Sequence, residues 1–152
     1  METKDQIREL HITNFNYDKI QSLKRNIKWN LNIDEYIDLY TSKCHYCDAA
    51  PSKIHFKRNI AIKYNSIDRK NSDKDYSLDN CVPCCSLCNQ VKSVKTYDSF
   101  LDELKNKKYE DFTLDNYIKL LNISYFFNTI TYNDFVSWGQ SILEKYSKNK
   151  IL

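Results

Sequence analysis

The chain has 152 residues, and 41% of them are hydrophobic, including seven Phe, twelve Tyr and two Trp. This length and composition support a packed core and exclude a disordered tail. A net charge of +3 is too small to identify a partner, and one Gly with two Pro leaves little material for hairpin turns or glycine-rich phosphate loops. We therefore expect an α+β protein, mostly helical, that forms a single domain over residues 1–152.

The first segment, residues 1–43, is predicted to be a helical, basic lead-in arm. Apolar residues recur there at helical spacing, at Ile20, Leu23, Ile27, Ile33, Ile37 and Leu39. No apolar run has the length of a signal-peptide core or of the ~20-residue stretch that a membrane span needs. We expect an intracellular protein that is not secreted and has no membrane partner.

The second segment, residues 44–95, carries two C-x2-C pairs, Cys44 with Cys47 and Cys85 with Cys88. Four thiolates are the ligand set of a tetrahedral structural zinc ion, and a reducing compartment disfavours disulfides. Cys81 and Cys84 form an overlapping pair of the same spacing. We choose Cys85 and Cys88 because a polar stretch able to open a helix follows Cys88, and we expect Cys81 and Cys84 to be small buried side chains.

The same segment contains two short strand candidates, at residues 60–64 and near residues 81–82, with a polar loop over residues 69–75. The third segment, residues 96–152, shows three helix starts, in which Thr96, Thr113 and Thr131 precede apolar residues at helical spacing. We expect C-terminal helices whose core residues are Phe100, Leu101, Leu104, Tyr117, Leu120 and Leu121.

Basic residues gather on both sides of the first cysteine pair, whereas acidic residues gather downstream of the second. The basic residues are Lys19, Lys24, Arg25, Lys28, Lys53, Lys57, Arg58, Lys63, Arg69 and Lys70. A basic front fits a polyanionic partner, although ordinary solvated helix faces give the same pattern.

The motifs around the cysteines resemble the zinc-containing HNH endonucleases, of the His-Me finger type common in phages and large DNA viruses. The resemblance lies in SIDRKN at residues 66–71 and YSLDNCVPCCSLCNQVK at residues 76–92. It extends upstream through KRNIKWNL at residues 24–31 and CHYC at residues 44–47, and downstream to SFL at residues 99–101.

This resemblance implies a ββα-metal core, with a strand ending near Asp68, a second strand near Asn80 and a helix starting at about Asn89. Asp68 and Asn89 would hold a catalytic Mg2+ or Mn2+, Asn80 would orient the loop through hydrogen bonds, and a structural zinc would fasten the core. Lys92 would contact a phosphate, unless it is an ordinary solvated lysine.

Arg69 stands where the family has its general-base histidine. A guanidinium with a pKa above ~12 cannot accept a proton at neutral pH, but it can bind a scissile phosphate through two hydrogen bonds. His55, expected in a basic loop before the first strand, and Tyr64 are the candidates for activating water. His55 can equally be a surface histidine, His45 is expected to lie beside the zinc or at the surface, and His11 carries no signal.

Three functions follow. The first is a metal-dependent DNA endonuclease, viral or phage in character, that works in the cytoplasm or nucleus of a host cell or in a virion. The second is an inactive relative that binds DNA or RNA, and the third is a structural zinc protein that binds a protein partner through its C-terminal helices. The residues expected to contact nucleic acid are Lys24, Arg25, Lys28, Lys53, Lys57, Arg58 and Lys92.

Overall fold

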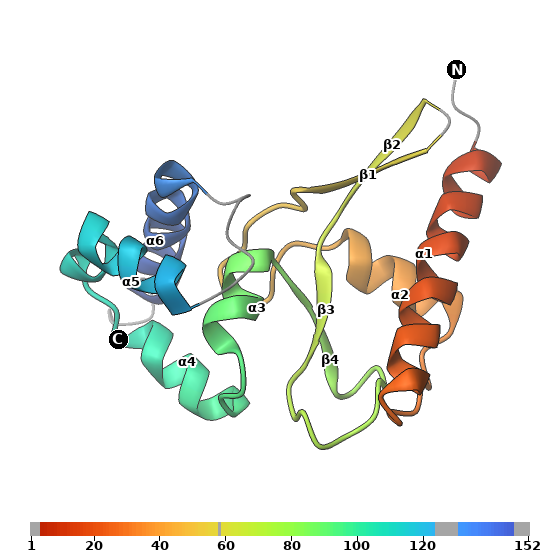
Figure 1. The fold of residues 1–152 in the computed structure, drawn as a ribbon, viewed down its shortest axis with the longest axis horizontal. Helices are drawn as coiled ribbons and strands as arrows, with labels where there is room; N and C mark the ends of the chain where they lie inside the picture. Colours follow the sequence, from red (N-terminus) through yellow and green to blue (C-terminus); the bar gives the residue numbers. More distant parts are fainter. Residues whose placement is uncertain (1–3, 58, 124–130, 148–152) are drawn as a thin grey trace. The chain divides into compact units, whose positions relative to one another are not determined.

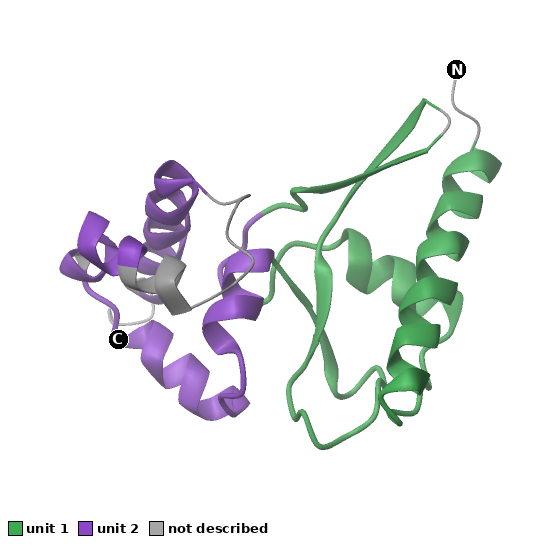
Figure 2. Cartoon of the chain, viewed as in Figure 1, with its two compact units in different colours: residues 1–45, 50–85 green, residues 46–49, 86–152 purple. Residues whose placement is uncertain are grey.

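The computed structural model describes residues 4–57, 59–123 and 131–147, and it shows the expected α+β architecture (Figure 1). The chain divides into two compact units (Figure 2). Unit 1 comprises residues 1–45 and 50–85, and unit 2 comprises residues 46–49 and 86–152. The expectation of a single domain stays a prediction.

Unit 1 begins with two helices, α1 (Lys4–Lys24) and α2 (Ile33–Thr41). A capping box fixes the start of the second helix. Asn32 Oδ1 accepts the backbone N–H groups of Asp34 and Glu35 at 3.0 and 2.9 Å, and Glu35 accepts the N–H of Asn32 at 2.9 Å. These bonds satisfy donors that the first helical turn leaves without partners.

An antiparallel hairpin follows, formed by β1 (Lys53–Lys57) and β2 (Ile60–Tyr64). The prediction of a strand at residues 60–64 is confirmed, but the prediction that His55 lies in a loop is wrong. His55 lies in β1 opposite Ile62. The alternation of Ile54 and Phe56 with polar residues has the two-residue period of a strand, and Asn59, with φ of 67°, supplies the left-handed conformation of the turn.

A second two-stranded antiparallel sheet is formed by β3 (Ser66–Arg69) and β4 (Cys81–Cys84). Asp68 lies opposite Val82 and Arg69 opposite Cys81. The strands expected to end near Asp68 and to run through residues 81–82 are therefore present. Buried Asn65 separates β2 from β3, and its Nδ2 donates to the carbonyl of Ser42 at 2.9 Å.

The core of unit 1 is aromatic. Leu10, Tyr36, Tyr40 and Ile62 form its buried centre. The Tyr40 ring stacks on Tyr36 at 4.8 Å and on Tyr64 at 4.3 Å between centroids. Because a buried tyrosine hydroxyl needs a hydrogen-bond partner, this core requires polar side chains nearby.

Helix α1 supplies those partners, and this corrects the expected apolar face. Ile20 and Leu23 are 51% and 54% exposed, whereas the helix buries Leu10, His11, Asn14 and Ser22. Asn14 Nδ2 donates to the Tyr40 hydroxyl at 2.9 Å, and the Tyr36 hydroxyl donates to Asp18 at 2.7 Å. The polar stripe of α1 faces the core because the tyrosine hydroxyls must be hydrogen-bonded.

Unit 2 contains α3 (Ser86–Lys92), α4 (Tyr97–Lys105), the 3-10 helix η1 (Tyr109–Phe112), α5 (Leu114–Ile123) and α6 (Tyr132–Ser147). The three predicted starts near residues 96, 113 and 131 are confirmed. The N–H of Ser99 donates to Thr96 Oγ1, and the N–H of Asp134 donates to Thr131 Oγ1. Helix α3 begins at Ser86, three residues before the predicted start at Asn89.

Aromatic side chains also dominate the core of unit 2. Its buried residues include Tyr46, Phe100, Leu104, Phe112, Phe135, Trp138, Ile142 and Tyr146. Of the predicted core residues, Phe100 and Leu104 are buried, Leu101 and Tyr117 are half-buried, and the side chains of Leu120 and Leu121 lie outside the described part. Among the described helices, none combines the length and apolar character that a membrane crossing requires.

Candidate functional site

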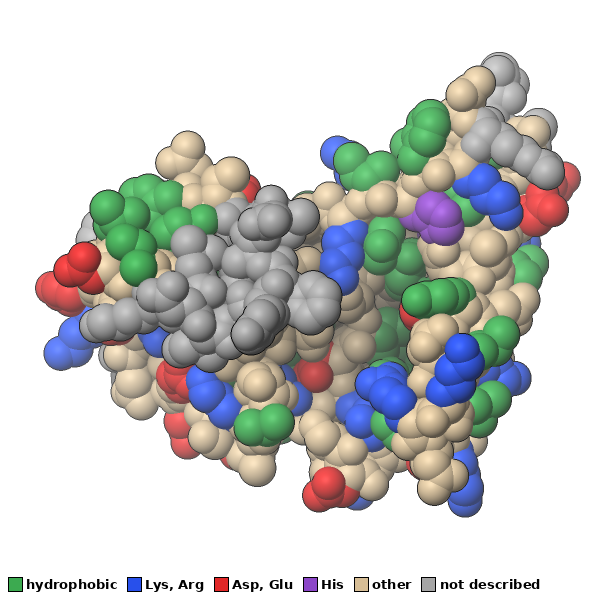
Figure 3. Space-filling model, viewed as in Figure 1, with side chains coloured by type: hydrophobic (Ala, Val, Ile, Leu, Met, Phe, Trp, Pro, Cys, Tyr) green, Lys and Arg blue, Asp and Glu red, His purple; other side chains and the backbone are tan. Residues whose placement is uncertain are grey.

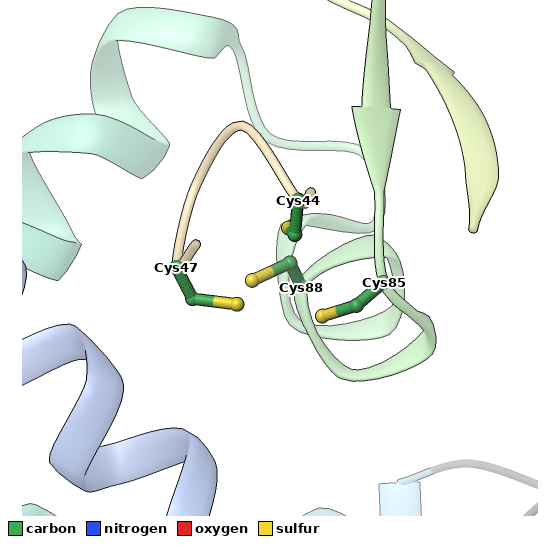
Figure 4. A group of neighbouring side chains, drawn as sticks. All are labelled: Cys44, Cys47, Cys85 and Cys88. Carbon is green, nitrogen blue, oxygen red and sulfur yellow. The ribbon is translucent and has the colours of Figure 1, made fainter. Parts of the chain in front are cut away.

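Cys44, Cys47, Cys85 and Cys88 form a compact group of four thiols (Figure 4). Their Sγ atoms all lie within 4.8 Å of one another, and each residue is at most 6% exposed. A tetrahedral zinc ion with Zn–S bonds of about 2.3 Å holds its sulfur atoms roughly 3.8 Å apart. The donor set and its spacing therefore fit a structural zinc ion, and the predicted association of these two pairs is confirmed.

The overlapping pair, Cys81 and Cys84, does not belong to this group. Both residues lie in β4 and are buried. Burial raises the pKa of Cys81 to about 11, while a hydrogen bond with Cys44 and burial raise the pKa of Cys84. Both side chains are therefore neutral thiols near pH 7, as expected for small buried residues.

The backbone around the first cysteine pair is held on both sides. The N–H of His45, whose side chain is exposed, donates to the carbonyl of Pro83 at 2.8 Å. The carbonyl of Tyr46 accepts the hydroxyl of Tyr146 at 2.9 Å. Asp48 has φ of 60°, so the chain turns directly after Cys47 in a conformation that aspartate tolerates.

Trp138 contributes to the cysteine group in a way that the sequence did not suggest. Its Nε1–H donates to Cys88 Sγ at 3.1 Å, and both groups are buried. A hydrogen bond to sulfur favours the thiolate that a zinc ion requires. The two residues are 50 positions apart, so no local spacing could have indicated this contact.

The loop between β3 and β4 is organised by Asn80, which is 4% exposed. Its Nδ2 donates to the carbonyls of Asn71 and Asp75 at 3.0 and 2.9 Å, and its Oδ1 accepts the N–H of Asn71 at 3.0 Å. The backbone of Asn80 also accepts the N–H of Lys70 at 2.7 Å. One buried amide therefore closes the loop, which is the arrangement that the resemblance implied for this asparagine.

Arg69 takes part in the same loop. Its Nη1 donates to the carbonyl of Ser72 at 2.6 Å and to that of Lys74. The guanidinium also lies 5.1 Å from the centre of the Tyr76 ring, a cation–π distance. These contacts make Arg69 a support for the loop backbone, and its assignment as a phosphate ligand stays a prediction.

The basic end of α1 is joined to this loop. The Tyr76 ring stacks on Trp29 at 4.8 Å, and Arg25 Nη2 donates to the Tyr76 hydroxyl at 3.1 Å. The N–H of Lys28 donates to Asp75 Oδ1 at 3.1 Å. The structure therefore brings residues 25–28 against the loop over residues 70–76, although the two segments are distant in sequence.

The two proposed cation ligands belong to different units of the chain. Asp68 is half-buried in β3 of unit 1, and Asn89 is exposed in α3 of unit 2. The shift of the helix start to Ser86 puts Asn89 at the fourth position of α3. Their joint role as ligands of Mg2+ or Mn2+ stays a prediction.

The two candidates for activating water differ in their surroundings. Tyr64 is stacked on Tyr40 with an interplanar angle of 5°, so its ring belongs to the core of unit 1. His55 is half-buried, on the same hairpin face as its partner Ile62. Of the two, Tyr64 is part of the aromatic stack and His55 is not.

The residues expected to contact nucleic acid differ in their exposure. Lys24, Arg25, Lys28 and Lys57 are exposed, whereas Arg58 lies outside the described residues. Lys53 is half-buried, where it donates to Ser66 Oγ and burial lowers its pKa.

Lys92 requires a correction. It is 1% exposed, so it is not a solvated surface lysine, and this burial also counts against a phosphate contact at this position. Lys92 is the last residue of α3, and a helical period in the sequence does not reveal that its side chain is buried.

Comparison with known proteins identifies one viral relative. An uncharacterized protein of Acanthamoeba polyphaga mimivirus is 29% identical over 121 residues, which are 80% of this chain and 20% of that protein. The chain thus spans about a fifth of the length of this relative. No protein-family model matches the chain, and no solved structure matches it. The viral relative agrees with the viral character that the resemblance implied.

Proposed function

We propose that this chain is a metal-dependent DNA endonuclease of the HNH type. The observation that carries the proposal is the loop between β3 and β4. It follows the strand that bears Asp68, Asn80 closes it with three side-chain hydrogen bonds, and the exposed basic residues Arg25 and Lys28 lie against it. An acidic side chain, a rigid loop and nearby cations are the parts that a phosphodiesterase of this type needs.

In this proposal, Asp68 and Asn89 supply hard oxygen donors of the kind that Mg2+ and Mn2+ prefer. When bound, the cation would neutralise the charge that develops on the phosphate and on the leaving oxygen. Arg25 and Lys28 would bind neighbouring backbone phosphates. A zinc ion on the four cysteines would hold the segment that follows α2 to the segment that follows β4.

A second candidate is an inactive zinc module that still binds nucleic acid. The observation that favours it is the state of Arg69, which stands at the position of the family's general base. A guanidinium cannot take a proton from water at neutral pH. Here Nη1 donates to two loop carbonyls, so the residue has a structural use that does not depend on catalysis.

Cleavage assays on supercoiled plasmid and on single-stranded DNA separate the two candidates. Zinc-loaded protein is incubated with Mg2+ or Mn2+, beside Asp68→Ala, Asn89→Ala and the control Asp73→Ala, which removes an exposed carboxylate from the same loop. We expect cation-dependent cutting that both site variants abolish and the control retains.

Arg69→His extends the test, because it restores the missing base. If wild type and Arg69→His both bind DNA without cutting it, the endonuclease proposal fails and the binding module stands. If only Arg69→His cuts, the site retains its other parts and the wild-type chain is the inactive relative.

A further inference from the structure

The hairpin of β1 and β2 has two faces of different character. The register pairs His55 with Ile62, and Ile62 is 6% exposed, so this face belongs to the core of unit 1. Ile54 and Phe56 alternate with these residues and pair with Lys63 and Ala61 on the opposite face. Because successive side chains of a strand point to opposite faces, these four residues share the outer face of the ribbon.

The outer face presents large apolar side chains to solvent. Ile54 is 60% exposed and Phe56 is 65% exposed, and Ala61 and Lys63 are exposed beside them. On the face drawn in Figure 3, hydrophobic side chains gather over the hairpin next to lysine or arginine side chains. An outward strand position ordinarily carries a polar residue, so two large apolar residues on this ribbon indicate a contact surface.

The charge of the ribbon indicates which partner fits. Residues 53–64 contain Lys53, Lys57, Arg58 and Lys63 and no acidic residue. Lys63 is exposed and shares the outer face with Ile54 and Phe56, whereas Lys57 is exposed at the end of β1 on the other face. Apolar side chains framed by cations complement a nucleic acid, because its bases offer apolar faces and its backbone offers phosphates.

We infer that this hairpin is a DNA-contacting arm in which Phe56 stacks against bases, with Ile54 beside it and Lys63 on a flanking phosphate. The inference rests on the proposed function only in taking DNA as the partner, and it does not require the cation site to be active. A two-stranded ribbon is narrow enough to enter a groove of duplex DNA, and an apolar side chain can insert between base steps. The same ring can stack on the bases of a single strand.

The test measures binding of zinc-loaded protein to a fluorescent duplex and to a single strand of the same sequence, over a range of salt concentrations. Phe56→Ala is compared with Tyr17→Ala, which removes an aromatic ring that is 63% exposed on α1. Base stacking by one aromatic residue corresponds to about 5- to 150-fold in affinity. We expect a loss of this size for Phe56→Ala and little change for Tyr17→Ala.

The salt dependence distinguishes stacking from charge. Phe56→Ala should leave the slope of log affinity against log salt unchanged, whereas Lys63→Ala should reduce its magnitude by about one. A 2-aminopurine base in each DNA reports the contact itself, since its fluorescence depends on stacking. A Phe56-dependent change in the duplex indicates insertion, and one confined to the single strand indicates stacking on unpaired bases; either supports the arm.

The outcomes separate the arm from the proposed function. If wild type binds DNA and Phe56→Ala binds as tightly as Tyr17→Ala, the arm is refuted while the proposed function stands. If wild type shows no salt-dependent binding to either DNA, both fail. If Phe56→Ala instead converts a dimer to a monomer in light scattering without changing DNA affinity, the face is a contact between copies and the inference is overturned.

Discussion

Replacement of Asn80 with alanine tests whether the loop between β3 and β4 depends on one buried amide. The change removes two donated hydrogen bonds, to Asn71 and Asp75, and one accepted bond, from the N–H of Asn71. Each such bond contributes about 0.5–1.5 kcal/mol net. Because Asn71 is exposed and Asp75 half-buried, water replaces part of the lost bonding. We therefore expect a loss of roughly 2 kcal/mol in the free energy of unfolding.

Urea unfolding of zinc-loaded protein measures this loss, and hydrogen exchange of the backbone amides of Lys70 and Asn71 locates it. Asn80→Asp is the sharper variant, since it retains the acceptor and replaces the donor with an oxygen that faces two carbonyls. It should destabilise at least as much as alanine at neutral pH. Asn16→Ala, at an exposed position of α1, is the matched control.

The expected result for the control is a change within about 0.5 kcal/mol, as for ordinary surface substitutions. If Asn80→Ala falls within the same range and the two amides exchange at the wild-type rate, the loop does not depend on Asn80. The reasoning from buried hydrogen bonds would then be refuted.

Three further predictions concern the metal group, a helix contact and a buried acid. Removal of zinc by a chelator, or Cys47→Ser, should sharply lower the unfolding temperature, because structural zinc contributes about 10–16 kcal/mol in apparent binding free energy. The control Cys81→Ser should retain one zinc ion per chain in metal analysis. Equal loss of zinc in both cysteine variants would contradict the assignment of the ligands. Gly139→Ala places a Cβ in steric overlap with the ring of buried Phe112. The overpacking, about 1–3 kcal/mol, should exceed the gain of about 0.5–1 kcal/mol from helix propensity, so the urea midpoint should fall; a higher midpoint would contradict this prediction. Burial raises the pKa of Asp18, so the contribution of its protonated form to stability is present at low pH and lost as pH rises through the raised pKa. Asp18→Asn should therefore gain stability relative to wild type as pH increases above about 3.9. A difference in urea midpoints that stays constant across pH would contradict the direction of this pKa shift.

Several features of this protein follow from short stretches of sequence. The spacing within each C-x2-C pair is a local property, and so are the threonine caps before α4 and α6 and the strand at residues 60–64. The choice of Cys85 and Cys88 over the overlapping pair Cys81 and Cys84 depends on the polar residues that follow Cys88, and the grouping of the thiols agrees with it. These features were predictable because neighbouring residues supply all the atoms that define them.

Other features depend on partners that the sequence does not place. Helix α1 buries Asn14 instead of Leu23 because Tyr40 needs a hydrogen bond, and that tyrosine comes from another helix. In this helix the hydrophobic pattern was outweighed by contacts between distant segments. His55 was expected in a loop although Ile54 and Phe56 alternate with polar residues at strand spacing, so the local signal for β1 was present and its pairing with β2 confirms it.

Short stretches of sequence were enough to predict the four-cysteine group that fits zinc, the strands around Asp68 and the threonine caps of α4 and α6. The burial of Lys92, the support that Arg69 gives to the loop backbone and the hydrogen bond from Trp138 to Cys88 became visible only in the folded chain. Burial and hydrogen bonding depend on which segments come together, so the role of a lysine, arginine or tryptophan changes when distant residues pack against it.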